Sequence, residues 1–387
     1  MSHRSATRQR IAYFESLRGL AAMVIVIYHL GGDSWLIDNN LVNNAWMMLD
    51  FFFILSGCVI TMAFQAQVRT ALGVGDFLYG RFLRVYPLHL VMLGVFFALE
   101  LVKLAGTTWL GIAADTPAFA ENNATTLLHN LFFTNVLLVE NLSWNKPAWS
   151  IAAEFWTYLI FALLALIFRH HPARFLSICG LIAFSAFVFL ANHDMSAYHG
   201  MARCLWGFFL GVLLAHLVTA ERVRCSARLA NLAVILTAVI LTSKAWPFMD
   251  GRAVFFTSVF FFLLLALFTS PDDTAFKRLL GNRYLVRLGT ISFGIYMIHS
   301  AVWWILSQAA RVVTRLQPEL LQSGGYEDAL QNPMIANVVL FIGLPLTIAL
   351  AEWSYRKLEY PIYQKRWTRP RWLQRLARED SSLSSQP

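Results

Sequence analysis

Hydrophobic residues occur along the whole chain in long stretches that short polar segments separate. About ten of these stretches approach the roughly 20 residues that a helix needs to cross a hydrocarbon core. They cover residues 13–32, 45–65, 86–106, 150–168, 175–191, 198–218, 229–245, 253–269, 288–310 and 335–355. Because open strands would leave backbone groups unpaired in lipid, the pattern predicts an all-α, polytopic membrane protein with about ten transmembrane helices.

One further hydrophobic stretch is too short to cross a membrane. LLHNLFFTNVLLV, residues 127–139, contains His129, Asn130 and Asn135. We expect a re-entrant or interfacial segment here.

The two ends of the chain differ in character. The N-terminal stretch follows three arginines, as a signal peptide would, but it contains Glu15 and Arg18 and no small-residue cleavage site follows. It is therefore predicted to be a retained first helix. In this interpretation residues 1–356 form the transmembrane domain, and residues 357–387 form a basic, then Ser-rich, cytoplasmic tail that is too short for a second folded domain.

Lysine and arginine are distributed unequally between the predicted loops. With the N-terminus in the cytoplasm, most of them fall on inner segments, and the outer segments hold only Lys146, Lys244, Arg252, Arg311 and Arg315. Cytoplasmic loops of membrane proteins carry such an excess of positive charge. Both termini are therefore predicted to be cytoplasmic.

The composition narrows the class of protein further. Hydrophobic residues make up 58% of the 387 residues and charged residues 14%, which is too apolar for a soluble protein of this size. The formal net charge of +9 follows from the topology and from attraction to anionic membrane lipid, so we expect no nucleic-acid partner. The four cysteines occur singly and predict neither a metal site nor a disulfide framework.

The first helix carries two ionisable residues that are costly inside a membrane and therefore candidates for function. Arg18 and His29 are eleven residues apart, which is three helical turns plus roughly 20°, so they share a face about 16 Å apart along the axis. His29 lies in the predicted outer half. It is either a catalytic imidazole or a histidine whose hydrogen bonds lock two helices together.

Two carboxylates are predicted at a depth comparable with that of His29. Asp50 begins the second helix and Glu154 lies near the start of the fourth. A carboxylate bonded to one ring nitrogen of His29 would fix its tautomer and raise the basicity of the other nitrogen, as a general base for a hydroxyl requires. The sequence does not indicate which carboxylate does so, and both are candidate catalytic residues with His29.

Two arginines precede Pro87 on the cytoplasmic side. Arg81 and Arg84 are three residues apart and are expected to be neighbours at a helix start. Two such guanidinium groups are suited to binding phosphates. The alternative is ordinary anchoring of positive charge at the cytoplasmic membrane surface.

Late in the chain, Ser292, Tyr296 and His299 are spaced by four and three residues and lie on one helical face. They either line a cavity or join helices by hydrogen bonds. We regard Tyr296, His299 and Trp149 as candidate substrate-binding residues.

Several segments together resemble a known family. They are RIAYFESLRGLAAMVIVIYHL, LDFFFILSGCVIT, DFLYGRFLRVYPLHL, PAWSIAAEFWTYLIF, SFGIYMIHSAVW and RKLEYPIYQKR. In this order they are similar to motif blocks of the membrane acyltransferase family 3, and they cover nearly the whole chain. Glu15 stands where aspartate is commoner in the family.

This resemblance implies an acyl-CoA donor on the cytoplasmic side, no metal, and a hydroxyl acceptor on a surface glycan, either the polymer or a lipid-linked form of it. It implies a central role for His29, with other motif positions at Arg18, Arg81, Arg84 and Glu154, and a place in the bacterial inner membrane. No esterase-like domain follows the last helix, as one does in some members, so direct transfer to the acceptor is expected.

The hypothesis is therefore a membrane O-acyltransferase, most simply an O-acetyltransferase. A transporter or flippase of a lipid-linked sugar is an alternative, because intramembrane Arg, His and Glu also line transport paths. Another alternative is the other large class of membrane-bound O-acyltransferases, in which the essential histidine is expected late in the chain, here at His299.

Overall fold

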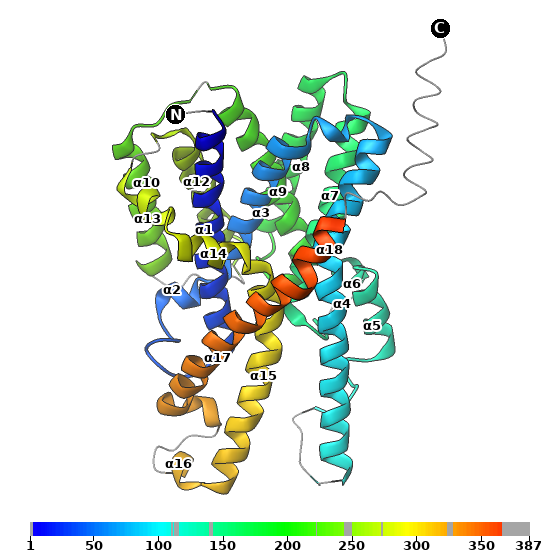
Figure 1. Cartoon of the computed structure of the whole chain (residues 1–387), viewed down its shortest axis with the longest axis vertical. Helices are drawn as coiled ribbons and strands as arrows, with labels where there is room; N and C mark the ends of the chain where they lie inside the picture. The colour runs from blue at the N-terminus through cyan, green and yellow to red at the C-terminus, as the bar shows by residue number, and fades with distance from the viewer. Residues whose placement is uncertain are drawn as a thin grey trace.

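The computed structural model describes residues 3–109, 111, 116–138, 142–221, 223–243, 250–271, 274–322 and 328–365. Within these ranges the regular structure is helical, with no strand. The elements are α1 (His3–Leu30), α2 (Asn40–Asn43), α3 (Met47–Phe64), η1 (Gln67–Arg69), α4 (Ala71–Trp109), α5 (Ala124–Leu131), α6 (Asn135–Leu138), η2 (Lys146–Ala148), α7 (Trp149–Ile167), α8 (Pro172–Ala191), η3 (Ala197–His199), α9 (Gly200–Thr219), α10 (Ala227–Ser243), α11 (Ala253–Thr257), α12 (Val259–Thr269), α13 (Ala275–Leu280), α14 (Arg283–Thr290), α15 (Ser292–Leu316), α16 (Glu319–Gln322), η4 (Ala329–Gln331), α17 (Pro333–Ser354), η5 (Tyr355–Glu359) and α18 (Tyr360–Lys365) (Figure 1).

The helices confirm the predicted class. In the described ranges, 7 helices are long and apolar enough to cross a membrane, and the number rises to 8 if α14 and α15, bent by 67° at their junction, are counted as one span. The predicted stretches 229–245 and 253–269 correspond to shorter apolar helices. The all-α polytopic architecture is thus confirmed, whereas the number of about ten transmembrane helices is not.

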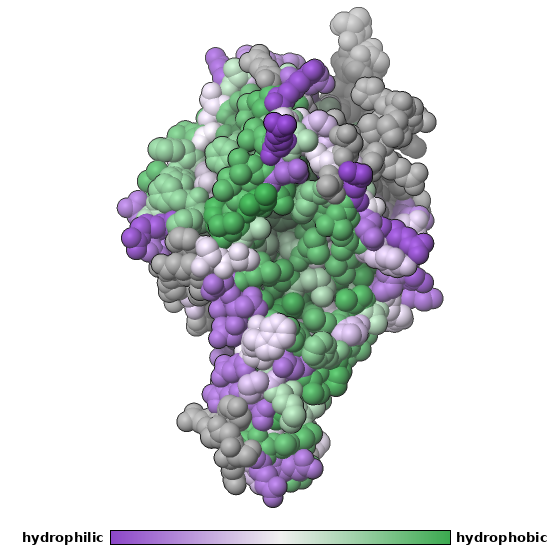
Figure 2. All heavy atoms as spheres, turned by 90° about the vertical axis from the view of Figure 1, so that its left-hand side faces the viewer, coloured by the Kyte–Doolittle hydropathy of each residue, from purple (hydrophilic) through white to green (hydrophobic). Residues whose placement is uncertain are grey.

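The surface of the bundle is that of a protein surrounded by lipid. Large hydrophobic side chains such as Phe262, Leu181 and Phe341 are more than half exposed, which a soluble monomer would avoid over so wide an area. Figure 2 shows hydrophobic residues spread over the middle of one face, with hydrophilic residues toward its ends and edges.

Helix α4 is much longer than the predicted span 86–106. Its 39 residues extend about 58 Å, nearly twice the thickness of a hydrocarbon core. Pro87 lies inside this helix, so the prediction that Arg81 and Arg84 stand at a helix start is wrong. A proline removes one backbone hydrogen bond but does not end a helix whose flanking turns are packed, as Phe77 and Leu88 are here.

The stretch 127–139 does not form a membrane-crossing helix in its described residues. It contains the short helices α5 and α6 with a break between them, where Phe133 adopts a positive φ of 57°. This agrees with the expected short, non-crossing segment.

The connection from α4 to α7 is held by polar side chains at both ends. Glu100 of α4 accepts hydrogen bonds from the backbone N–H of Phe119 and from the Asn122 side chain, both at 2.8 Å. Asn122 in turn accepts from the backbone N–H of Trp144, and Asn145 donates to the carbonyl of Met297 in α15 at 2.9 Å. The start of α7 is thereby fixed to α4 and to α15.

Glycines allow two helix crossings to be close. A Cβ at Gly289 of α14 would overlap the carbonyl of Glu15 in α1, and one at Gly19 would lie 2.7 Å from the Gly289 nitrogen. In the same way Gly57 of α3 faces the Phe208 carbonyl of α9. Small residues at such contacts are typical of membrane helices, because packing rather than hydrophobic burial drives their association.

The last helix does not end where the sequence suggests. After α17 the chain continues as one π-helical turn, η5, and then as α18 to Lys365. The boundary predicted at residue 356 therefore lies inside a continuous helix, and the rest of the predicted tail, 366–387, lies outside the described residues.

Candidate functional site

His29 lies at the C-terminal end of α1, and the local sequence explains why the helix stops there. Gly31 and Gly32 follow with φ values of 66° and 111°, in the region that glycine adopts readily and that commonly ends helices. The indole N–H of Trp303 donates to the carbonyl of Val26 at 2.8 Å, which ties the last turn of α1 to α15. His29 is an exposed residue, whereas Leu30 and Val26 beside it are buried.

The partner of His29 is another histidine. Nδ1 of His29 and Nε2 of His299 are 3.0 Å apart, and the two rings are nearly parallel, with centroids 5.0 Å apart. His299 is fully buried in α15. In the described contacts His299, and not Asp50 or Glu154, lies beside one ring nitrogen of His29; a carboxylate partner of His29 stays a prediction.

Tyr296 connects this histidine pair to α7. Its hydroxyl lies 2.8 Å from the Ser150 hydroxyl and donates to the carbonyl of Pro147 at 2.8 Å. Ser292, Tyr296 and His299 are all buried, as expected for one face of α15. Hydrogen bonding between helices, one of the two interpretations left open by the sequence, describes Tyr296 correctly.

Polar residues continue along one face of α7. Ser150, Glu154 and Tyr158 are spaced by four residues and so lie above one another over about 12 Å. The Tyr158 hydroxyl lies 3.1 Å from that of Ser56 in α3. The Glu154 carboxylate interacts with the hydroxyls of both Tyr158 and Tyr296.

Arg81 of α4 completes this line of residues. It interacts electrostatically with Tyr158, and its guanidinium lies over the Phe64 ring at 4.8 Å from the centroid. We call the whole line the polar seam; it consists of His29, His299, Tyr296, Ser150, Glu154, Tyr158, Ser56 and Arg81. It joins α1, α15, α7, α3 and α4 through the interior of the bundle.

Asp50 belongs to a different cluster. Its carboxylate is fully buried and binds Arg203 of α9, with an Nη2–Oδ2 distance of 2.8 Å and an Nε–Oδ1 distance of 3.3 Å. Arg203 also donates to the carbonyls of Met195 and Trp46 at 2.7 Å and 3.0 Å. A catalytic role for Asp50 stays a prediction, but the described contacts of its carboxylate are with Arg203.

Sequence reasoning missed Arg203. Its positive charge interacts electrostatically with Tyr28, which precedes His29, and with Tyr296 of the polar seam. A single arginine inside a hydrophobic span, at residues 198–218, is the signal that identifies such a residue.

The remaining candidate arginines interact with different partners. Arg18 forms an ion pair with Glu15 at 3.2 Å, one turn earlier on α1. Arg84 interacts with Tyr355 and Glu359 of η5 and so has different neighbours from Arg81. Binding of a donor by these arginines stays a prediction.

Trp149 begins α7 and is buried. The guanidinium of Arg203 lies 5.5 Å from its ring centroid, and a Cβ at Gly200 would lie 2.5 Å from the ring. In the described structure Trp149, Tyr296 and His299 face other parts of the protein, and their part in substrate binding stays a prediction.

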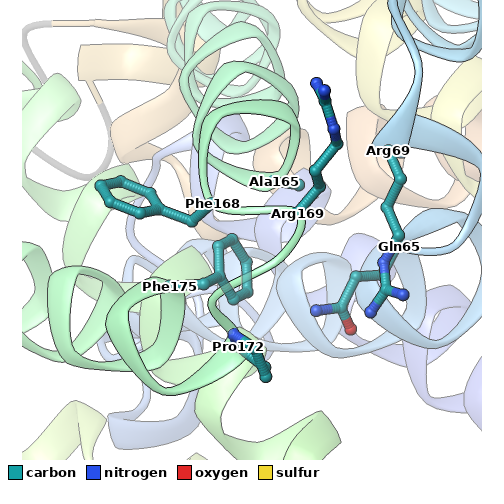
Figure 3. Close-up of a pocket in the computed structure, with 7 residues that line it drawn as sticks. All are labelled: Gln65, Arg69, Ala165, Phe168, Arg169, Pro172 and Phe175. Atoms are coloured by element: carbon teal, nitrogen blue, oxygen red, sulfur yellow. The ribbon is translucent and has the colours of Figure 1, made fainter.

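A pocket opens at the end of the bundle where α3 and α7 end and α8 begins. It is lined by Gln65, Arg69, Ala165, Phe168, Arg169, Pro172 and Phe175 (Figure 3). Both arginines are exposed. They lie on segments that the charge distribution assigns to the cytoplasmic side.

Fold and site together define a polytopic helical membrane protein with a polar seam of ionisable and hydroxyl side chains in its interior. Residues 11–352 match the model of the family described as an acyltransferase domain. The chain therefore belongs to the acyltransferase family, and the family and enzyme class predicted from the sequence are confirmed.

Relatives of this chain carry related names. The peptidoglycan O-acetyltransferase OatA of Listeria monocytogenes is 26% identical over 92% of this chain and 56% of its own length. The O-acetyltransferase OatA of Staphylococcus aureus is 24% identical over 91% of this chain and 57% of its own. The acyltransferase MdmB of Streptomyces mycarofaciens is 24% identical over 84% of this chain and 91% of its own. The chain thus spans little more than half the length of the OatA proteins, and no solved structure matches it.

Proposed function

We propose that this protein transfers an acyl group, most simply acetyl, from a cytoplasmic acyl-CoA to a hydroxyl of a cell-surface glycan. The observation that carries the proposal is an exposed imidazole, His29, at one end of a polar seam whose other end is Arg81. A donor with phosphates requires cations where it enters and a base where it reacts, and the seam offers both. Relatives named as peptidoglycan O-acetyltransferases support a sugar of peptidoglycan as the acceptor.

The reaction assigns His29 one of two roles. As a general base it takes the proton of the acceptor hydroxyl while the oxygen attacks the thioester carbonyl, the C–S bond breaks, and the CoA thiolate receives a proton; such catalysis contributes about 10² to 10⁴ in rate. As a nucleophile it attacks the thioester carbonyl, the C–S bond breaks, and the CoA thiolate leaves and takes up a proton. The acceptor hydroxyl then attacks the acyl-imidazole, the acyl–nitrogen bond breaks, and the released imidazole takes the hydroxyl proton. In the first role a ring nitrogen of His29 must reach the acceptor hydroxyl, and in the second it must reach the carbonyl carbon of the thioester.

The donor is expected to bind with its phosphates at arginines. Arg81 and Arg84, and with them Arg18, are the candidates from the sequence, and Arg69 and Arg169 line the pocket at the same predicted side. Guanidinium groups bind phosphates in pairs of hydrogen bonds, which lysines do not. The proposal places the protein in a bacterial inner membrane with both termini in the cytoplasm, and its acceptor is either the polymer or a lipid-linked precursor.

The test is mass spectrometry of the surface glycan from cells that lack the gene and carry either the wild-type protein or His29→Ala. Wild type is expected to add a fixed acyl mass to the glycan, and His29→Ala to add none while reaching the membrane at the wild-type level. His193→Ala is the matched control, because His193 is exposed and its ring nitrogen Nδ1 bonds the carbonyl of Phe189, one turn earlier, outside the polar seam. Full acylation by His29→Ala would refute the proposal.

Purified protein in liposomes separates the proposal from its alternatives. A transporter of lipid-linked sugar neither consumes labelled acetyl-CoA nor transfers the label to a glycan. In an enzyme of the other membrane-bound class, His299 would be essential and His29 dispensable.

A further inference from the structure

The hydrogen bonds around His299 have a direction that can be read from its partners. Nδ1 of His299 lies 3.3 Å from the carbonyl oxygen of Ile295, one turn earlier in α15. A carbonyl oxygen only accepts hydrogen bonds. The proton of the neutral His299 ring is therefore on Nδ1.

The other nitrogen of His299 must then be an acceptor. A second proton would make the ring a cation, and a fully buried cation requires a counter-charge. His299 is fully buried, and within the described residues it makes no ion pair with a carboxylate. The Ser300 hydroxyl, 3.3 Å from Nε2, also fits an acceptor at that position.

This direction fixes the tautomer of His29. Because Nε2 of His299 accepts, Nδ1 of His29 at 3.0 Å must donate. In the neutral His29 ring the lone pair then lies on Nε2. The described residues provide no hydrogen-bond partner for this nitrogen, and His29 is an exposed residue. An unoccupied lone pair on an accessible nitrogen is what a base or a nucleophile needs.

We propose that His299 is a positioning residue that holds His29 in the Nδ1–H tautomer, with the basic Nε2 directed to the reaction. A series of hydrogen bonds runs from the Ile295 carbonyl through His299 to His29. In this series His299 has the position that a carboxylate has in familiar catalytic triads. The end of α1 supports it, since a helix C-terminus favours the imidazolium that forms when Nε2 takes a proton. The catalytic consequence rests on the proposed acyl transfer, but the tautomer itself does not.

The test compares His299→Gln with His299→Leu in the full-length protein. A glutamine side-chain oxygen can accept the proton of His29 Nδ1, whereas leucine leaves this proton without a partner. We expect His299→Leu to lose about 10²-fold or more in kcat, in line with other enzymes whose catalytic histidine loses its orienting partner. KM for acetyl-CoA should stay within about 3-fold, because binding is not altered. His299→Gln should retain activity to within about 10-fold of wild type.

A second measurement does not depend on acyl transfer. Diethylpyrocarbonate modifies the unprotonated nitrogen of an accessible histidine, and peptide mass spectrometry gives the rate at His29. The rate should fall in His299→Leu, where the lone pair moves between the two nitrogens, and remain near wild type in His299→Gln. Thermal melting of each variant shows that it is folded.

The outcomes separate the two proposals. If wild type transfers no acyl group but the labelling of His29 follows the expected order, the acyl-transfer proposal fails and the tautomer assignment stands. If folded His299→Leu labels and turns over like wild type, His299 does not position His29. Equal loss of both signals in folded His299→Gln and His299→Leu also overturns the inference, because an acceptor alone would then not suffice.

Discussion

Removing the guanidinium of Arg203 should strongly destabilise the protein. The Arg203→Met variant keeps most of the side-chain volume but leaves Asp50, which is fully buried, without its counter-charge. It also leaves the carbonyls of Met195 and Trp46 without a donor. Breaking a buried ion pair in this way costs about 3–5 kcal/mol.

The expected change in melting temperature follows from the size of the chain. With the entropy of unfolding per residue of globular proteins, this loss corresponds to a decrease of roughly 4 to 6 °C for a chain of this length. The assay is thermal unfolding in detergent, followed with a dye that fluoresces on reaction with thiols. It suits this protein because three free cysteines, Cys58, Cys179 and Cys204, are buried and react only on unfolding.

A double variant and a control variant test whether the unpaired charge causes this loss of stability. Replacing both partners, Arg203→Met with Asp50→Leu, should recover much of the lost stability, because no unpaired charge remains. The control is Arg252→Met, which breaks the pair with Asp250 at an exposed site and should not change the melting temperature measurably. If Arg203→Met melts like Arg252→Met, the buried ion pair does not stabilise the fold as argued here.

Two other predictions concern packing and hydrogen bonding. Gly289→Leu should prevent close contact of α14 with α1 and should lower the expression level and the melting temperature. Gly180→Leu is the control and should be tolerated, because a Cβ at that position meets no atom within 4 Å. Equal melting temperatures of the two variants would contradict the role given to the glycine contact. Tyr296→Phe removes the hydrogen bonds to Ser150 and to the Pro147 carbonyl. It should lower the free energy of unfolding by about 1 to 3 kcal/mol, measured in the same thiol assay. An unchanged melting temperature would show that these hydrogen bonds contribute nothing to stability.

The fold class followed from the sequence because lipid imposes a strong and simple pattern. Stretches of apolar residues indicated an all-α membrane protein, and the spacing of Ser292, Tyr296 and His299 placed them on one helical face, where the structure buries all three. The pattern did not give the length of α4, because Pro87 was taken as a start although packing on both sides keeps the helix intact. It also did not predict the bend of 67° between α14 and α15, because no proline or glycine stands between the two helices to indicate one.

The sequence offered candidate residues for the site but did not indicate their pairings. His29 and His299 are 270 positions apart, and periodicity within one helix carries no information on which helices meet. The same limit explains why Asp50 was considered a partner of His29 although Arg203 binds it. Contacts between helices depend on small residues and crossing geometry, which one sequence shows only indirectly.

The hydrogen bonds of Asn122 and Asn145, which hold the connection between α4 and α7, limit how this protein tolerates changes in length. Surface connections usually accept insertions at little energetic cost. Here the connection is tied at Asn122 to Glu100 and at Asn145 to the Met297 carbonyl, and Ser150 follows only five residues later. Grafting a longer connection from a relative between these two asparagines would therefore have to preserve both ties, or the hydroxyl that meets Tyr296 would move with the graft.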